Sequence, residues 1–406
     1  MRIFLIIALT LLLIAGGVVA YLMMTTPRDP VLLQFPLSEH HRQLLELVPA
    51  SAEMFALVPS AAHLHRTLTA NPVTRDAIAR WAFEHELPRS WMLGGAEVVV
   101  WRRGGVTSYA VRLDRGRAWI LRTWLAVASH AEVRWDGTTL MMNAGTESAS
   151  PASLEGILAL TEGLPEGDAL IVQREGERGA FPPIGRPAVT SARVTESGLT
   201  TVSRSPDPAL HEGAVLQGQF PRGALLAVTF SDPPRVLSDL HRIIGTRIDD
   251  LIGKGGSVVL YEVDSGTFLP RPRGVIAVPA DAERREAMRQ IAGIADLIGE
   301  TSETDDELIV SFGRGSVERY HADERDPARW SASRWAVRLD PQRLAPVLRK
   351  AGDSTGLRIA APRLHRGARD LRRWLSTLER AESIEAASSN GQGFEELRVH
   401  VAARTK

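Results

Sequence analysis

The sequence predicts an α+β fold: an N-terminal transmembrane helix followed by duplicated β-α-β-β-α-β units, the ferredoxin-like or split βαβ order, with extra hairpin strands. Three observations predict it. An apolar run fills residues 3–24, strand-like and helix-like segments then alternate along the chain, and their order occurs twice. The length of 406 residues allows two or three domains, and a hydrophobic content of 44% supplies their cores.

The composition excludes several classes of function. The 48 Lys and Arg residues balance 48 Asp and Glu residues, so the chain lacks the basic excess of a dedicated nucleic-acid binder. With no cysteine, it has no disulfide, thiol nucleophile or Cys-ligated metal. Nearly all the positive charge is arginine, which fits either guanidinium recognition of anions or an arginine-biased genome, and we favour the second interpretation.

The apolar run at residues 3–24 carries no charge and is 22 residues long, or roughly 33 Å as a helix, enough to span a bilayer. Val18, Val19 and Ala20 also fit the cleavage site of a signal peptide. We favour an uncleaved anchor because the run continues past that site. Arg2 weakly favours a cytoplasmic N-terminus, which predicts a single-pass inner-membrane protein with its C-terminal bulk in the periplasm.

Residues 25–48 are expected to form a proline-rich tether and a short helix capped by Ser38. The first α+β repeat is placed at 49–215, the second at 216–330 and a C-terminal part-repeat at 331–406. In the first repeat, apolar patterns predict these elements in chain order: a strand at 54–58, a helix after Ser60, strands at 97–101 and 108–113, a helix at 115–129, and a hairpin at 132–135 and 138–143 around Asp136 and Gly137. A helix at 152–160 and strands at 169–173 and 188–193 are expected to follow.

The second repeat is predicted from a similar succession of elements. It comprises strands beginning at 224, 258, 274 and 307, with helices after Asp232 and Asp281. Landmarks such as Ser60 and Ser231, or Gly94 and Gly255, are separated by 161 to 171 residues, which indicates an internal duplication. In the part-repeat, we expect a strand at 335–339, helices at 341–350 and 363–382, and strands near 384 and at 397–401.

One family resemblance rests on the stretch 47–58, LVPASAEMFALV, after the apolar segment and before the repeated strand–helix units. This layout resembles an uncharacterised family of bacterial single-pass, membrane-anchored envelope proteins. The resemblance implies location and architecture only, because no catalytic motif comes with it.

No catalytic, metal or cofactor site is predicted. The pairs His40-His41 and His63-x-His65 lack a third close ligand. Asp264-Ser265-Gly266 has no second copy, as an aspartic protease would require, and is typical of a turn after a strand. A site assembled only in three dimensions remains open at this stage.

Two basic features are candidate interaction surfaces. Arg366, Arg369 and Arg373 group on one side of the predicted helix at 363–382, and a basic loop contains Phe268, Arg271 and Arg273. For both, solvation without a partner is the more common outcome. Six tryptophans in the first repeat favour core packing, with a hydrophobic ligand groove as the alternative: Trp81, Trp91, Trp101, Trp119, Trp124 and Trp135.

The absence of catalytic motifs favours a non-catalytic accessory or scaffold that binds other envelope proteins. The alternative is a lipid or amphiphile binder, with the tryptophan-rich first repeat as the favoured site, and an envelope hydrolase ranks third. The expected partners are the membrane, through residues 3–24, an envelope protein and, in the alternative, a lipid, with no nucleic acid and no cofactor.

Overall fold

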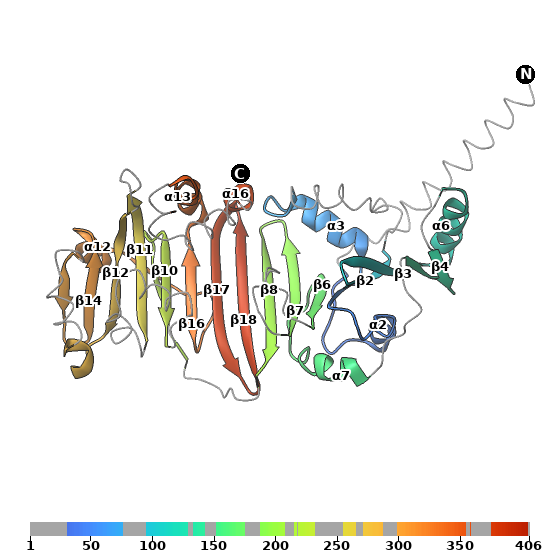
Figure 1. Cartoon of the computed structure of the whole chain (residues 1–406), viewed down its shortest axis with the longest axis horizontal. Coiled ribbons are helices and arrows are strands. Elements are labelled where there is room, and N and C mark those ends of the chain that lie inside the picture. Colours follow the sequence, from blue (N-terminus) through green and yellow to red (C-terminus); the bar gives the residue numbers. More distant parts are fainter. Residues whose placement is uncertain are drawn as a thin grey trace, which may run out of the picture. The chain divides into compact units, whose positions relative to one another are not determined.

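The structure is a computed structural model whose chain divides into two compact units, Met1–Pro206 and Asp207–Lys406. Figure 1 labels their helices and strands. The described residues are 31–75, 95–128, 133–142, 152–174, 187–207, 215–216, 218–231, 255–264, 271–286, 299–354, 358 and 375–404.

In the first unit, eight described strands form an antiparallel sheet in the spatial order β4-β5-β3-β2-β1-β6-β7-β8. The strands are β1 (Met54–Val58), β2 (Glu97–Arg103), β3 (Val106–Arg112), β4 (Val133–Asp136), β5 (Thr139–Met142), β6 (Ala169–Gln173), β7 (Ala188–Thr195) and β8 (Gly198–Pro206). β1 is central and pairs with both β2 and β6.

The second unit also contributes eight described strands, in the order β13-β14-β12-β11-β10-β16-β17-β18. They are β10 (Leu226–Phe230), β11 (Gly256–Asp264), β12 (Arg271–Pro279), β13 (Thr301–Glu303), β14 (Glu307–Phe312), β16 (Trp335–Leu339), β17 (Ala381–Gly391) and β18 (Phe394–Ala403). Two short strands, β9 (Gln219–Pro221) and β15 (Arg325–Pro327), form a separate pair.

The two units have the same topology. Taken in chain order, β1 to β5 correspond to β10 to β14, and β6 to β8 correspond to β16 to β18. With this correspondence the two spatial strand orders are identical. Smaller features repeat as well: a bridge joins Leu33 to Gly167 in the first unit and Leu216 to Ala332 in the second. β16, β17 and β18, from the expected part-repeat 331–406, therefore hold the places of β6, β7 and β8.

The helices lie in the connections between strands. In the first unit these are α2 (Glu39–Leu45), α3 (Ala61–Ala70), α6 (Arg115–Ala128) and α7 (Ala152–Ala159), and in the second α12 (Ser316–Ala322), α13 (Pro341–Asp353) and α16 (Leu375–Leu378). Ser38, Ser60 and Asp340 cap α2, α3 and α13, each accepting a backbone N–H bond with its side-chain oxygen. The predicted helix at 363–382 differs: residues 363–374 lie outside the described residues, and β17 begins at Ala381.

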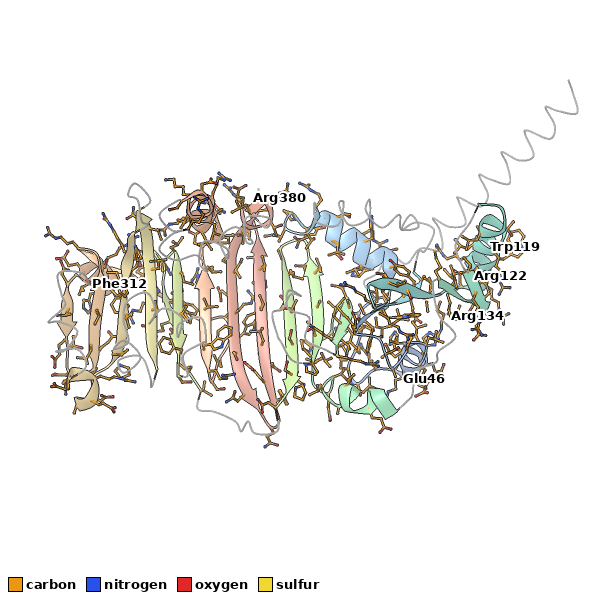
Figure 2. All side chains as sticks on the ribbon, in the orientation of Figure 1. Glu46, Trp119, Arg122, Arg134, Phe312 and Arg380 are labelled. Carbon is orange, nitrogen blue, oxygen red and sulfur yellow. The ribbon has the colours of Figure 1, made fainter. Side chains whose placement is uncertain are left out.

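Both faces of each sheet are covered by side chains (Figure 2). In the first unit, α2 and α7 pack with Phe55 and Leu57 on one face, while α3 and α6 pack with Val58 and its neighbours on the other. Alternating residues of a strand point to opposite faces. Strands such as β2 therefore need apolar residues at successive positions, and Val98 and Val99 bury on opposite faces.

The predicted ferredoxin-like fold is wrong. In a split βαβ unit the strand after the first helix runs parallel to the strand before it, with another strand inserted between them. Here β1 and β2, which flank α3, are direct antiparallel neighbours. The described chain is mostly antiparallel sheet with sixteen strands in the two units. Most elements of the first repeat were predicted in the right order, but β8 (Gly198–Pro206) was missed. The order of elements does not determine how the strands pair.

The expectation of a single-pass membrane protein is also corrected. The longest described helix, α6, has 14 residues, or roughly 21 Å, and no helix in the described part of the chain combines the length and apolar character needed to span a bilayer. We therefore do not carry the transmembrane helix, the signal anchor or the inner-membrane location forward. Residues 3–24, on which they rested, lie outside the described residues.

A glycine in β12 tests the strand packing. A Cβ atom on Gly274 would lie 2.1 Å from the carbonyl oxygen of Val259, beside the irregularity where β11 shifts its register against β12. We expect Gly274→Ala to lower the free energy of unfolding by about 1 to 3 kcal/mol, because the strands must move apart. Urea denaturation measures the change.

The matched control is Gly156→Ala in α7, where an added Cβ meets no atom within 4 Å. It is expected to raise stability by about 0.4 to 1 kcal/mol, through helix propensity and a more restricted unfolded chain. Equal effects of the two substitutions would contradict the close approach of β11 and β12.

Candidate functional site

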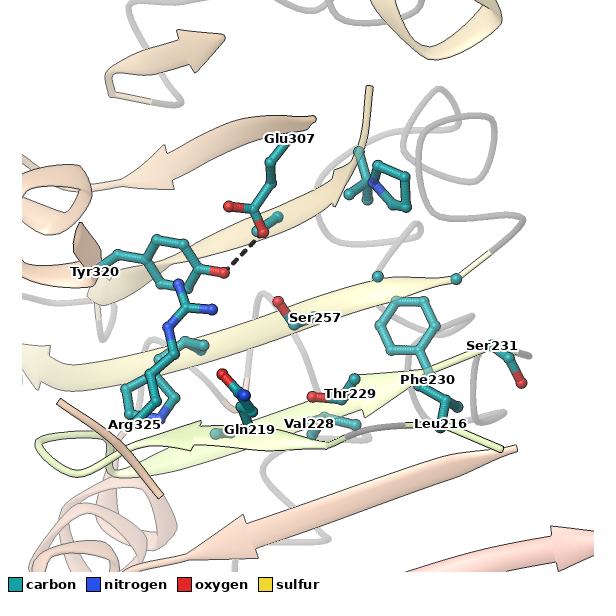
Figure 3. Close-up of a pocket in the computed structure, with 18 of the residues that line it drawn as sticks. Leu216, Gln219, Val228, Thr229, Phe230, Ser231, Ser257, Glu307, Tyr320 and Arg325 are labelled. Atoms are coloured by element: carbon teal, nitrogen blue, oxygen red, sulfur yellow. Dashed lines mark hydrogen bonds between the residues drawn. The ribbon is translucent and has the colours of Figure 1, made fainter. Parts of the chain in front are cut away.

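The candidate site is an open pocket of about 550 Å³ in the second unit (Figure 3). Strands β10, β11 and β12 form its floor. Residues of β9, β14 and α12 form its walls, together with Arg325 of β15. All of these elements lie within the second unit, so the pocket is complete there.

The pocket exists because this face of the second unit carries small side chains. The strand correspondence places Ala227 and Thr229 of β10 where β1 has Phe55 and Leu57, and Ser257 of β11 where β2 has Val99. In the first unit, those larger side chains join the core.

The segment that precedes the central strand also differs between the units. In the first unit α2 buries Leu44 and Leu45 on this face. In the second unit the short strand β9 lies ahead of β10, and Gln219 and Pro221 from it line the pocket. This face is therefore filled by large strand residues in the first unit, whereas in the second unit a pocket lies beside a core that contains Phe220, Tyr261 and Tyr320.

Tyr320 of α12 organises the polar side of the pocket. Its ring is 2% exposed, and its hydroxyl donates a 2.9 Å hydrogen bond to Oε1 of Glu307. The Arg325 guanidinium lies over the same ring, 4.5 Å from its centroid (Figure 3). Burial raises the pKa of Tyr320, so the hydroxyl stays a donor at neutral pH. The arrangement is suited to holding a ligand that has both polar and apolar parts.

The histidines considered as metal ligands have other partners. Nε2 of His63 lies 2.9 Å from Oδ1 of Asp168, whose other oxygen accepts from the backbone N–H of Val194. Asp168 is 1% exposed, so this pair fastens α3 to the ends of β6 and β7.

His40 and His41 lie beside a carboxylate on the first unit. Nε2 of His40 is 2.8 Å from Glu97, and His41 also bonds Ser38 of the α2 cap. Burial lowers the pKa of His41, more than the nearby Glu97 carboxylate raises it. Within the described ranges, no group of three or more His, Asp or Glu residues is placed to hold a metal ion.

An exposed aromatic side chain marks a second surface. Trp119 on α6 is 67% exposed, and Arg115 and Arg122 are also exposed at the preceding and following turns of the same helix face. Arg122 stacks on Trp135 of β4 and donates to the Gly137 carbonyl, which fixes its position. Figure 2 shows Trp119, Arg122 and Arg134 at the same end of the first unit. We call Arg115, Trp119, Arg122 and Arg134 the α6 patch.

The interaction residues predicted from sequence are only partly placed. Phe268, Arg366, Arg369 and Arg373 lie outside the described residues. Arg271 and Arg273 begin β12, and Arg273 is exposed. Pro279, at the other end of the same strand, lines the pocket, so Arg273 is roughly 20 Å from it along the strand. Their role as an interaction surface stays a prediction.

The pocket residues were not predicted from the sequence. Glu307, Tyr320 and Arg325 are isolated in the sequence and form no motif. A usable signal was present in the repeat itself: the strand at 226–230 reads LAVTF where the first repeat reads MFALV at 54–58, with Ala and Thr at the positions of Phe and Leu. Of the six tryptophans, Trp101 is buried in the core, whereas Trp119 is exposed.

Comparisons with protein-family models, with curated proteins and with solved structures found no match to this chain. The resemblance to anchored envelope proteins therefore stays a prediction.

The tyrosines provide a test of side-chain burial in both units, with Tyr109 in the first and Tyr261 and Tyr320 in the second. Burial raises the pKa of Tyr109, Tyr261 and Tyr320, and for Tyr261 the Asp323 carboxylate adds to the effect. In the unfolded chain these phenols ionise near pH 10. Because the folded form holds their protons at higher pH, their contribution to stability is complete below about pH 10 and is lost as pH rises further.

We therefore expect thermal stability to fall above about pH 10, and absorbance at 295 nm to show these three phenols ionising only as the chain unfolds. Tyr320→Phe should remove one late-ionising group while leaving the other two. Ionisation of all the tyrosines near pH 10 in the folded protein would contradict the burial described here.

Proposed function

We propose that the protein is a non-catalytic binding protein whose second unit takes a small amphipathic ligand in the pocket beneath Tyr320. The observation that supports this is the paired comparison of the repeats: one fold, with the face closed by Phe55 and Leu57 in one unit and opened by Ala227 and Thr229 in the other. An apolar pocket with a few convergent polar groups is the usual form of a small-molecule site.

The polar groups support binding of a ligand with a distinct head. Glu307 is partly buried and Arg325 exposed, and both are positioned by one buried ring. The floor below them is made of the buried Ala227, Val259 and Ala277, and the half-buried Thr229 and Ser257 lie beside them in the lining. A ligand with a polar head and an apolar body fits this distribution.

Closing the pocket tests the proposal. Thr229→Leu combined with Ser257→Val gives the second unit the first unit's residues at two floor positions. We expect the double variant to bind the amphipathic fluorophore 1-anilinonaphthalene-8-sulfonate at least tenfold more weakly than the wild-type chain, because the added methyl groups occupy the pocket. Fluorescence titration measures the affinity, and circular dichroism checks the fold.

Thr229→Val is the control, because valine has nearly the shape of threonine and leaves the pocket open. It should bind the fluorophore as the wild type does. Unchanged binding in the double variant, with the fold intact, would contradict a ligand site at this pocket.

A second candidate function is the binding of another protein, as expected from the sequence. The α6 patch favours it, because exposed tryptophan and arginine are the residue types most enriched at energetic centres of protein interfaces. Three arginines flank Trp119 in the patch, so the surface complements an acidic partner.

Native mass spectrometry of the chain purified from its own host distinguishes the two candidates. A retained small molecule supports the pocket, and a stoichiometric protein companion supports the α6 patch. Trp119→Ala is expected to weaken such a companion's binding by about thirtyfold, whereas Val106→Ala, at another exposed apolar position, should leave it unchanged. A companion that survives Trp119→Ala at full occupancy would exclude the patch.

A further inference from the structure

The pocket contains two opposite charges that do not neutralise each other. Glu307 and Arg325 both line it, and neither forms a salt bridge within the described part of the chain. Arg325 differs in this respect from two nearby arginines. Arg222 pairs with Glu324 and Asp326, and Arg338 pairs with Asp326. The carboxylate of Glu307 and the guanidinium of Arg325 are therefore available to a ligand in the pocket.

Tyr320 holds the two charges in fixed relation. Its hydroxyl engages one oxygen of Glu307 and leaves the carboxylate's charge unneutralised, because the donor is a neutral phenol. Its ring face supports Arg325 without consuming the guanidinium's N–H groups, since a cation–π contact uses the face of the cation. Both charges are therefore within one contact of the same buried side chain, close enough for one small molecule to meet both.

The remaining lining defines the rest of the ligand. Ala227, Val259 and Ala277 form an apolar floor next to the two charged groups, and Ser257 adds a hydroxyl beside Tyr320. A simple fatty acid would satisfy Arg325 and the floor but would leave Glu307 facing a carboxylate or an apolar chain. A simple amine would satisfy Glu307 and the floor but would leave Arg325 without an anion.

We propose that the pocket selects a small zwitterion with an apolar side chain, of the chemical class of the free apolar α-amino acids. Its ammonium group binds Glu307 and its carboxylate binds Arg325. Its side chain lies over the floor of Ala227, Val259 and Ala277, against the half-buried Leu216, Thr229 and Ser257 that also line the pocket. This inference rests on the proposed function and specifies its ligand class.

The test is isothermal titration calorimetry of the full chain with three matched probes. L-leucine has both charges, 4-methylpentanoate lacks the ammonium, and L-leucinamide lacks the carboxylate. We expect L-leucine to bind at least tenfold more tightly than either analogue, because each lost charge-assisted hydrogen bond leaves one protein charge unpaired.

Two variants assign each charge to its partner. Glu307→Gln should weaken L-leucine at least tenfold without weakening 4-methylpentanoate, and Arg325→Gln should weaken L-leucine similarly without weakening L-leucinamide. The control is Arg285→Gln, which removes an exposed ion pair with Glu303 outside the pocket lining and should change none of the three affinities.

The outcomes separate this inference from the proposed function. If the three probes bind equally while the fluorophore still requires an open pocket, the zwitterion assignment is overturned and the binding pocket stands. If neither the probes nor the fluorophore respond to Thr229→Leu with Ser257→Val, both are overturned.

Discussion

The constraint on which the structure depends is that each sheet is buried on both faces. A strand in such a sheet must place apolar groups at successive positions, and the pair Val98 and Val99 shows this, because the two side chains enter different cores. The helices follow from the same requirement. They lie in the connections between strands and cover the two faces, capped at their starts by Ser38, Ser60 and Asp340.

Duplication lets the two units be compared position by position. One topology with the same hydrogen-bonded neighbours has large strand residues filling this face in the first unit, and in the second unit a pocket beside a smaller-residue core with Phe220 and Tyr261. The other face of the second unit keeps large residues such as Phe230, Ile276 and Leu308. A sheet with two independent cores can lose volume on one side and still be held together by the other, which is how a pocket is compatible with stability here.

Local patterns in the sequence predicted elements better than their assembly. The strand at 54–58, the helix after Ser60 and the strand at 307–312 were placed correctly, because apolar alternation and capping residues are local signals. Strand pairing is a long-range property, and the residues between 58 and 97 do not indicate that β2 pairs antiparallel with β1. The site was missed for the same reason: Glu307, Tyr320 and Arg325 meet only because α12 packs on β12 and β14. The small residues at 227 and 229 become informative only beside their counterparts in the first unit.

One difference between the units lies in the length of a single connection. From β6 to β7 the chain has the residues between Gln173 and Ala188, whereas from β16 to β17 it runs from Leu339 to Ala381 and includes α13 and α16. The hairpin that follows has the same two-residue turn in both units, joining Thr195 to Gly198 and Gly391 to Phe394. The fold therefore accepts added chain at this point with the same hairpin turn and only a local register shift near Ala381, which makes the connection after Gln173 a suitable place for engineers to insert a reporter domain or affinity tag.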